Sequence, residues 1–221
     1  MKFNLLIGNG AGSFAHISAK KYRSSEGYIN QKSQRGQSIV ENDACRLNRI
    51  IVRELIKAGE NAISFQTSAA SITKNGNVKF FYLEPIKNYL KYDLVPVVYG
   101  DIVSDSKRGC SILSTEKIFN HLAKKLKPKK IILMSDVEGV YDFKKRVIPE
   151  INKINFQKIK KFLKGADKID VTGGMLHKVK QAIEMTKKGS VVNIIGGKPG
   201  DLEKSLKGKK VGTKIYGFRK N

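Results

Sequence analysis

Short apolar segments alternate with longer amphipathic segments along the chain, and this alternation limits the possible folds more than any other feature. The apolar segments are rich in β-branched residues and read FNLLIG (3–8), AISF (62–65), LVPVVYG (94–100), KIILMSD (130–136) and VVNIIGG (191–197). Near-continuous apolar runs of this length are typical of parallel strands that are covered on both faces. Apolar residues recur at helical spacing between them, in 38–57, 115–126, 155–163 and 175–187. The sequence therefore predicts an α/β fold, a three-layer αβα sandwich with a mainly parallel central sheet and right-handed crossovers.

One segment departs from this alternation. SITKNGNVKFFY, at 71–82, has β-forming residues on both sides of Asn75-Gly76, which is the strongest short-range signal for a hairpin. We expect a β-hairpin near 71–82 at one edge of the fold. Because no internal repeat, low-complexity tract or linker interrupts the chain, residues 1–221 are expected to form a single domain.

The chain carries 43 Lys and Arg against 19 Asp and Glu, a net charge of +24. Such a charge can indicate a nucleic-acid partner. Only eight of the basic residues are arginine, however, whereas base and phosphate recognition favours the guanidinium fork. The lysines are also spread along the chain. We therefore interpret them as a solvated surface, expect no nucleic-acid partner, and note that an anionic small substrate is compatible with either interpretation.

Composition also places the protein in a cellular compartment. No apolar run approaches the ~20 residues that a membrane-spanning helix needs, and FNLLIG is too short for the apolar part of a signal peptide. Cys45 and Cys110 lie outside any metal-ligand or C-x-x-C spacing and are expected to be free thiols. The sequence predicts a cytoplasmic protein without a membrane partner.

Glycines and carboxylates collect where the predicted strands end. In an open α/β sheet, ligands bind outside the carboxyl ends of the strands, glycines let backbone N–H groups approach oxygens closely, and helix N-termini favour anions. None of these loops matches G-x-G-x-x-G or G-x-x-x-x-G-K-[ST]. The sequence thus predicts phosphate binding by loops of another kind, which read GNGAGSFAH (8–16), GD (100–101), SDVEGVY (135–141), DVTGGMLHK (170–178) and GGKPGD (196–201).

These segments carry a family resemblance. GAGSFAHISAKKY, VPVVYGDIVSD, SDVEGVYD, DVTGGMLHKV and KPGDLEKSLKGKKVGTKI follow the order of the amino acid kinase superfamily, and they are most similar to its isopentenyl phosphate kinase family. The resemblance runs from about Phe3 to the C-terminus. It implies ATP- and Mg²⁺-dependent phosphorylation of isopentenyl phosphate to isopentenyl diphosphate in isoprenoid biosynthesis (the alternate mevalonate pathway), by a homodimer. Two alternatives remain open: a sister kinase acting on fosfomycin or another small phosphate, or an inactive homologue that binds nucleotide or nucleic acid.

The resemblance also implies roles for individual residues. His16 would donate a hydrogen bond to the acceptor phosphate, Lys178 would reach the transferring phosphoryl group, and Glu116 would supply a catalytic carboxylate. Because the acceptor is itself a phosphate with a second pKa near ~6, it is a nucleophile without a strong general base. No residue is expected to ligate a metal directly. The residues implied to bind the acceptor are Gly10, Ala11, Gly12, Ser13, His16, Gly100 and Asp101; those implied to bind nucleotide are Asp136, Gly139, Val140, Tyr141, Thr172, Gly173, Gly174, Lys178, Pro199, Gly200 and Asp201.

Each of these residues also has an ordinary interpretation. Lys178 is one of many surface lysines, and His16 alone would be a loop histidine with no special role. The sequence also departs from the family pattern. Glu116 stands where the family has aspartate, and Ala15 and Ile17 replace a glycine and a proline.

A further departure is the absence of the family's first strand, with its Lys-x-Gly-Gly-Ser, and of the helix after it. This βα unit has about 40–45 residues. We expect a chain truncated at its N-terminus, through an upstream start codon or as a fragment, with a degenerate homologue as the remaining alternative.

Overall fold

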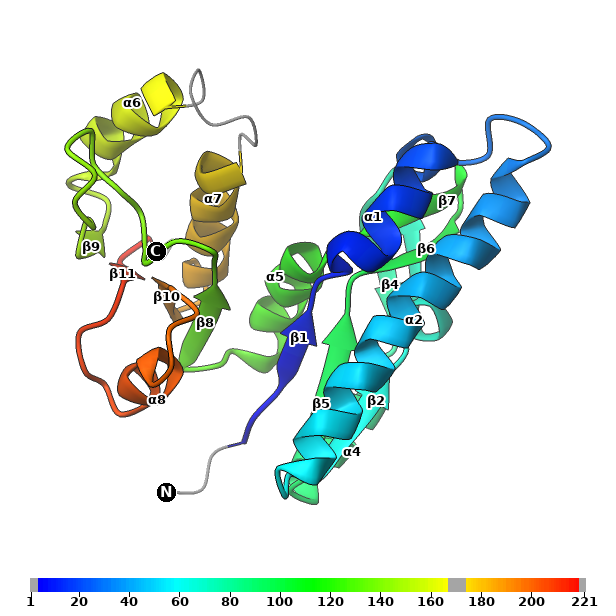
Figure 1. Ribbon diagram of the computed structural model, residues 1–221, viewed down its shortest axis with the longest axis horizontal. Coiled ribbons are helices and arrows are strands. Elements are labelled where there is room, and N and C mark those ends of the chain that lie inside the picture. Colours follow the sequence, from blue (N-terminus) through cyan, green and yellow to red (C-terminus); the bar gives the residue numbers. More distant parts are fainter. Residues whose placement is uncertain (1–3, 167–173, 219–221) are drawn as a thin grey trace. The chain divides into compact units, whose positions relative to one another are not determined.

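The computed structural model describes residues 4–166 and 174–218 (Figure 1). Contacts divide the chain into two compact units, an N-terminal unit, Met1–Ile118, and a C-terminal unit, Phe119–Asn221. Each unit has its own apolar core, and the described strands form two sheets in the N-terminal unit and one in the C-terminal unit. The expectation of a single domain stays a prediction.

A parallel three-stranded sheet lies at the centre of the N-terminal unit. Its order is β1-β5-β2, with β1 at Ile7–Asn9, β5 at Val95–Tyr99 and β2 at Ala62–Phe65. All five residues of β5 are buried, as the near-continuous apolar run predicts for a strand with neighbours on both sides. The three predicted strands of this half are confirmed, with β1 shorter than expected.

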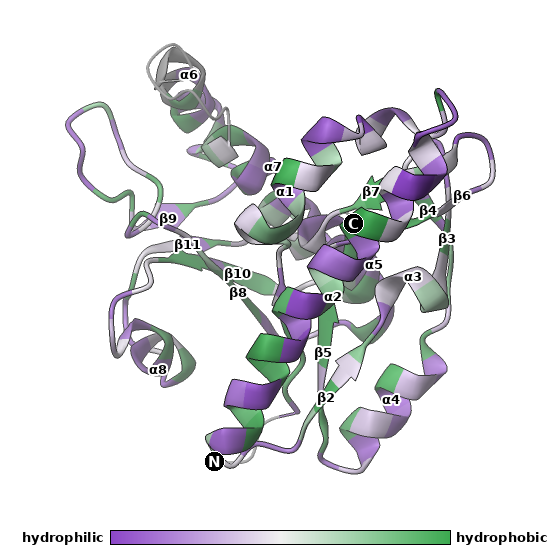
Figure 2. Cartoon of the chain, turned by 45° about the vertical axis from the view of Figure 1, so that its right-hand side comes forward, coloured by the Kyte–Doolittle hydropathy of each residue, from purple (hydrophilic) through white to green (hydrophobic). Residues whose placement is uncertain are grey.

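Helix α2 (Ser33–Lys57) packs on β2 and β5 of this sheet and on helix α1 (Gly12–Lys21). Its buried residues recur every fourth position, which places Val40, Ala44 and Val52 on one stripe while charged residues occupy the other side (Figure 2). The predicted helix 38–57 is therefore confirmed and begins five residues earlier. The other helical elements of the unit are α1 (Gly12–Lys21), the 3₁₀ turn η1 (Ser24–Glu26), α3 (Thr67–Ala70), α4 (Glu84–Lys91) and the start of α5 (Thr115–Leu126), which continues into the C-terminal unit.

A second sheet, ordered β4-β3-β6-β7, completes the N-terminal unit. The predicted hairpin is confirmed: β3 (Ser71–Lys74) and β4 (Asn77–Phe81) pair antiparallel, and Asn75 and Gly76 both have positive φ, as a type I′ turn requires. β6 (Asp101–Asp105) and β7 (Gly109–Leu113) form another hairpin. The loop expected at 100–101 is wrong, because Asp101 begins β6; this hairpin has no local signal, since the turn at 106–108 lacks Asn-Gly or Asp-Gly.

The C-terminal unit contains a mixed sheet of order β8-β10-β11-β9. β8 (Lys130–Met134) and β10 (Val191–Ile195) are parallel and confirm two predicted strands, whereas β11 (Thr213–Ile215) and β9 (Glu150–Ile151) are short and were not predicted. Helices α6 (Phe156–Ala166) and α7 (Gly174–Thr186) cover one face and α8 (Asp201–Leu206) lies on the other (Figure 2).

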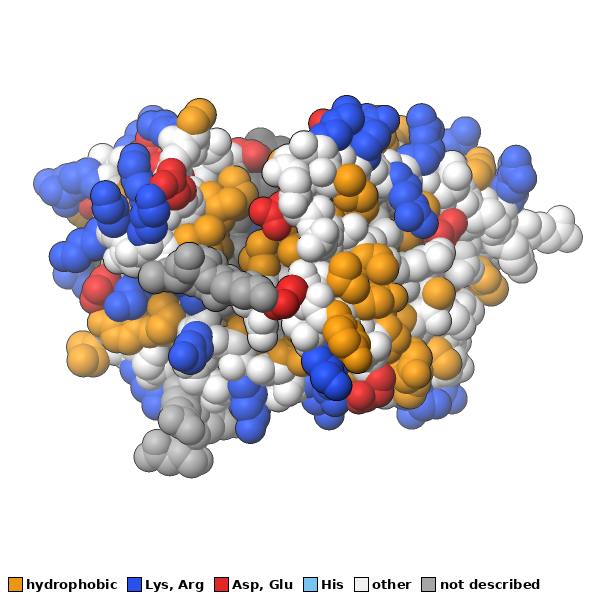
Figure 3. Space-filling model, turned by 90° about the horizontal axis from the view of Figure 1, so that it is seen from below, with side chains coloured by type: hydrophobic (Ala, Val, Ile, Leu, Met, Phe, Trp, Pro, Cys, Tyr) orange, Lys and Arg blue, Asp and Glu red, His pale blue; other side chains and the backbone are white. Residues whose placement is uncertain are grey.

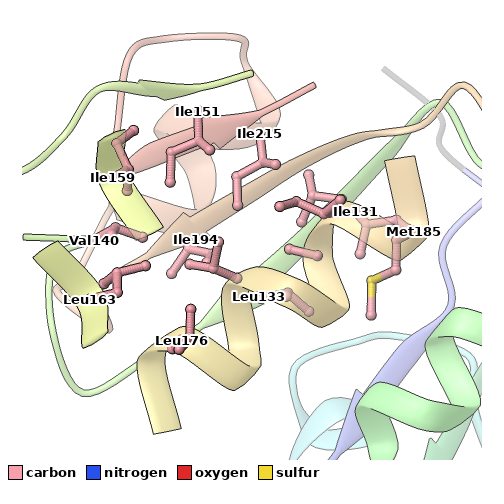
Figure 4. Close-up of a cluster of buried hydrophobic side chains, with 14 of the residues drawn as sticks. Ile131, Leu133, Val140, Ile151, Ile159, Leu163, Leu176, Met185, Ile194 and Ile215 are labelled. Atoms are coloured by element: carbon pink, nitrogen blue, oxygen red, sulfur yellow. The ribbon is translucent and has the colours of Figure 1, made fainter. Parts of the chain in front are cut away.

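Alternate residues of these strands form the core of the C-terminal unit. Ile131 and Leu133 of β8 and Ile194 of β10 point toward α7, where Leu176 and Met185 meet them (Figure 4). Apart from Met185, the buried members of this core are aliphatic, and the partly buried Phe119, Phe156, Met175 and Phe218 lie at its margin. This packing fixes α7 against the sheet, and it therefore fixes the backbone position of Lys178, which lies on α7.

Candidate active site

The glycine-rich segment after β1 is much shorter as a loop than the sequence suggested. β1 ends at Asn9, and α1 begins at Gly12, so only Gly10 and Ala11 connect them. His16 therefore lies one turn inside a helix, not in a loop, and its side chain is exposed. Ala15, its neighbour, is buried against Val40 and Ala44 of α2, so the replacement of the family's glycine at this position is explained by packing.

The first turn of α1 presents free donors. Ala11 caps the helix without a side-chain hydrogen bond, and no acidic residue lies in the first turn. The first N–H groups of a helix have no partner inside it and attract anions. Gly12 and Ser13 are exposed, and a Cβ added at Gly10 would meet nothing within 4 Å. The backbone at Gly10–Ser13 is thus open to an anionic ligand.

The backbone carbonyl group of Asn9 holds two other predicted residues, Gly100 and Glu116, near this loop. The oxygen of Asn9 accepts hydrogen bonds from the N–H of Gly100 at 3.0 Å and from Thr115 Oγ1 at 2.6 Å. Thr115 is the first residue of α5, so Glu116, which is half-buried, lies beside the same strand end. A Cβ at Gly100 would lie 3.1 Å from Thr115 Oγ1; close packing with α5 therefore explains this glycine.

Asp101 faces the interior of the unit. Its carboxylate accepts the N–H of Ser68 at 3.1 Å and that of Ile102 at 2.8 Å, and the residue is 3% exposed. Burial raises the pKa of this carboxyl to about 6, while hydrogen bonds from Ser68 and Ile102 lower it in part. Oδ2 thus anchors the first turn of α3, while Oδ1 accepts the hydrogen bond within β6 itself.

In the C-terminal unit, Lys178 lies at the carboxyl end of β8. Its Nζ donates to Ser135 Oγ at 3.2 Å, and the N–H of Ser135 donates to the carbonyl of Ile195 at 2.9 Å, which joins the ends of β8 and β10. Asp136 follows directly and is exposed. A lysine ammonium held at this strand end is placed to meet a phosphate as a point charge.

The segment Gly139–Tyr141 is fixed by β11. The N–H of Val140 donates to Thr213 Oγ1 at 2.8 Å, and Thr213 Oγ1 donates to the carbonyl of Ile148 at 2.7 Å. A Cβ at Gly139 would lie 2.8 Å from Val147 Cγ1. Val140 is completely buried, and Tyr141 bridges to Val147. Packing thus accounts for Gly139 and Val140, and Tyr141 is half-buried.

The remaining predicted nucleotide residues lie at helix starts. Gly200 has φ +85° and precedes Asp201, the first residue of α8, while Pro199 is exposed. Asp201 lies 3.8 Å from Lys204 Nζ. Gly174 is the first described residue of α7. Thr172 and Gly173 lie outside the described residues.

Sequence reasoning missed three polar residues of this site: Asn9, Thr115 and Ser135. Each lies next to a predicted residue and acts through a hydrogen bond to a distant segment. The sequence gives no direct sign of these contacts. One signal was present, though: Asn48 interrupts the buried stripe of α2, where an amide needs a partner.

On the face shown in Figure 3, Lys and Arg side chains are interspersed with acidic and apolar ones. Within residues 4–166 and 174–218, no group of three or more His, Cys, Asp or Glu residues could hold a metal ion. No helix among the described residues is long and apolar enough to cross a membrane.

Comparison with known proteins identifies a family. Residues 2–196 match the Amino acid kinase family. The chain is 34% identical to the isopentenyl phosphate kinase of Methanothermobacter thermautotrophicus over 97% of this chain and 85% of that protein. It is 36% identical to the isopentenyl phosphate kinase of Methanocaldococcus jannaschii over 97% of this chain and 81% of that protein.

Solved structures give the same result. An isopentenyl phosphate kinase crystal structure matches with a TM-score of 0.80 and 31% identity, over 96% of this chain and 83% of the other. The product complex of the Thermoplasma acidophilum isopentenyl phosphate kinase matches with a TM-score of 0.74 and 25% identity, over 96% of this chain and 83% of that one. The predicted α/β fold is thereby confirmed.

Proposed function

Because the chain belongs to the amino acid kinase family, and within it to the isopentenyl phosphate kinases, we propose that it transfers the γ-phosphoryl group of ATP to the phosphate of isopentenyl phosphate. An oxygen of the acceptor phosphate attacks the γ-phosphorus while the bond to the β–γ bridging oxygen breaks. The products are ADP and isopentenyl diphosphate. Since the acceptor oxygen is already ionised at neutral pH, catalysis consists of positioning two anions and stabilising the charge of the transferring group.

The observation that carries the acceptor half is the first turn of α1. Open backbone at Gly10, uncapped N–H groups and an exposed His16 lie on one short segment. In the proposal, the N–H groups and Ser13 hold the acceptor phosphate, and His16 donates a hydrogen bond to it. Gly100 and Asp101 form the wall beside this loop, and Glu116 contributes a carboxylate at its edge.

The nucleotide half rests on the loops of the C-terminal unit. Lys178, held beside Ser135, is proposed to contact the transferring phosphoryl group. Gly174 and, outside the described residues, Thr172 and Gly173 are proposed to contact nucleotide phosphates. Asp136, Gly139, Val140, Tyr141, Pro199, Gly200 and Asp201 are proposed to border the nucleotide.

Mg²⁺ is proposed to enter with ATP. The exposed Asp136 and the half-buried Asp201 are the carboxylates beside these loops, and oxygen ligands of this kind suit Mg²⁺, which keeps several of its waters. The ion supplies charge neutralisation on the phosphates. Asp136 and Asp201 would hold it through those waters.

Three further proposals follow from family membership. The protein acts as a homodimer, works in the cytoplasm, and forms one domain over residues 1–221. Light scattering after size exclusion tests the first, and a single cooperative unfolding transition in urea is the expected result for the last.

A direct assay tests the function. The protein is incubated with Mg-ATP and isopentenyl phosphate, and the product is followed by ³¹P NMR as the appearance of a diphosphate doublet. Fosfomycin and isopentenol serve as alternative acceptors. We expect diphosphate only from isopentenyl phosphate, and turnover of fosfomycin in its place would overturn the proposal.

Variants of His16 provide a second test of the proposed function. His16→Gln keeps an N–H donor, whereas His16→Ala removes it, so Ala should lose more turnover than Gln. The expected loss for His16→Ala is roughly 100-fold, as for removal of one transition-state donor. Full activity of His16→Ala would contradict the role assigned to this side chain.

A further inference from the structure

A fully buried amide lies in the middle of the apolar stripe of α2. Asn48 is 0% exposed, and its helical neighbours at the fourth position on either side, Ala44 and Val52, are buried apolar residues. Burying an amide is costly unless its donors and acceptor are hydrogen-bonded. The hydrogen bonds of Asn48 therefore explain how a polar side chain is accommodated between α2 and the sheet.

Asn48 connects all three strands of the parallel sheet. Its Oδ1 accepts a hydrogen bond from Ser64 Oγ of β2 at 2.6 Å. Its Nδ2 donates to the carbonyl of Val97 in β5 at 3.3 Å and to Asn9 Oδ1 at the end of β1 at 3.0 Å. Of these three partners, Asn9 is the one that lies next to Gly10 and Ala11, which are called the acceptor loop below.

The network has one consistent orientation. A backbone carbonyl only accepts hydrogen bonds, so the group of Asn48 that faces Val97 must be its NH₂. The same NH₂ donates to Asn9 Oδ1, and the NH₂ of Asn9 must then point the other way. There it donates to the carbonyl oxygen of Gly10 at 3.1 Å.

This last hydrogen bond orients the acceptor loop. The peptide between Gly10 and Ala11 is planar and trans, so the N–H of Ala11 points away from the carbonyl that Asn9 holds. Within the described part of the chain, no protein group accepts a hydrogen bond from this N–H. It is adjacent to the open first turn of α1, where the donors for the acceptor phosphate lie.

We propose that Asn48 is a positioning residue, which acts through Asn9 to fix the Gly10–Ala11 peptide so that its N–H donates to the acceptor phosphate. This inference rests on the proposed function. Asn48 itself touches no substrate. The loop has two residues, and one of them is a glycine with little conformational restriction of its own. Hydrogen bonds from an amide buried between the helix and the sheet therefore restrict its conformation.

Two variants separate positioning from stability, because each deletes one hydrogen bond of the same amide. Asn9→Ala removes the link to the loop and leaves the bonds of Asn48 to Ser64 and Val97. Ser64→Ala removes the link to β2 and leaves the loop side intact. The backbone oxygen of Asn9, which binds Gly100 and Thr115, is present in both.

Kinetics give the first readout. We expect Asn9→Ala to raise KM for isopentenyl phosphate about 10-fold, as for a misplaced donor to a charged group, with KM for ATP within about two-fold of the parent value. Ser64→Ala should leave both KM values within about two-fold. A purely structural role predicts lower apparent kcat with both KM values unchanged in both variants, and that result overturns the proposal.

The second readout does not need turnover. The amide proton of Ala11 is followed in ¹H–¹⁵N spectra while inorganic phosphate is added. We expect a downfield shift in the parent protein and in Ser64→Ala, and a smaller one in Asn9→Ala. If the parent phosphorylates isopentenyl phosphate but Ala11 does not respond to phosphate, the positioning proposal is wrong; if Ala11 responds but no diphosphate forms, the proposed function is wrong and the positioning proposal stands.

Discussion

Three glycines of the candidate site have different surroundings, and each has a different physical reason for being glycine. Gly10 has open space where its Cβ would be, Gly100 packs against Thr115, and Gly139 packs against Val147 and Thr213. In the sequence all three are simply glycines after a strand. Only Gly10 has the property expected of a backbone that a ligand approaches.

Gly10→Ala should therefore affect the ligand and not the fold. Its φ lies outside the left-handed region, and the new methyl group meets no protein atom, so the free energy of unfolding should change by less than about 0.5 kcal/mol. KM for the acceptor should rise. Gly139→Ala is the control, and it should destabilise by about 1–3 kcal/mol through overpacking. Urea unfolding and steady-state kinetics measure both effects, and an unchanged acceptor KM in Gly10→Ala would remove this residue from the site.

Asp101 makes stability depend on pH in an unusual direction. Burial raises the pKa of its carboxyl from 3.8 to about 6 in the folded protein. A group with a raised folded pKa binds more protons when folded, so its contribution to stability is present at low pH and is lost as pH rises through 6. Between pH 5 and 7.5 this loss should amount to about 1 kcal/mol.

Asp101→Asn tests this dependence. Its free energy of unfolding should change less between pH 5 and 7.5 than that of the parent, since all other titrating groups are shared. Urea unfolding at both pH values gives the difference. Equal changes in the two proteins would show that the carboxyl is ionised throughout this range.

At the scale of elements, one carboxylate joins the two hairpins of the N-terminal unit. Asp105, at the end of β6, accepts N–H groups from both turns: Asn75 and Gly76 of the first, and Lys107 and Arg108 of the second, at 2.8–3.1 Å. Burial alone would raise the pKa of this carboxyl. The hydrogen bonds together outweigh burial and hold the pKa well below its ordinary value.

Asp105→Asn should loosen both turns together. A carboxylate with a depressed pKa stabilises the fold above its unfolded pKa and loses this effect as pH falls. Replacing it with an amide should cost about 3 kcal/mol at pH 7, since several charge-assisted hydrogen bonds are lost. Glu84→Gln, in an exposed pair with Lys87, is the control and should cost less than about 1 kcal/mol. Urea unfolding measures both, and equal losses would refute the anchoring role.

Elements whose signal is local were predictable, and elements that depend on a distant partner were not. The stripe of α2 and the turn at Asn75-Gly76 are encoded in consecutive residues and were found. β9 and β11 have two and three residues and exist only because they pair with each other and with β10. The β6–β7 hairpin is held by Asp105, whose partners lie up to 32 residues away in sequence. No periodicity in the chain encodes such contacts.

At the scale of the whole molecule, the proposed chemistry is divided between the two units. The residues proposed to bind the acceptor fall within 1–118, and those proposed to bind nucleotide fall within 119–221. The resemblance implies both sets from short motifs, because the residues proposed to hold phosphates are consecutive in the sequence. It could not locate Asn48, Thr115 or Ser135, since their role arises from contacts across the fold. Mutations in one unit should consequently change the kinetic constants of one substrate.

Lys178→Ala should lower kcat without changing the acceptor KM. The ammonium is held by Ser135 at the end of β8 and is proposed to stabilise charge that develops on the transferring group, so its removal should cost roughly 100-fold in kcat. KM for ATP should rise by a smaller factor, and KM for isopentenyl phosphate should remain within about two-fold. Lys180→Ala is the matched control, because Lys180 is exposed on the same helix two residues further on. It removes the same charge from the same unit and should leave all three constants unchanged. If both variants lose activity equally, the reaction depends on the overall positive charge and not on the position of one ammonium group. The role proposed for Lys178 would then be wrong.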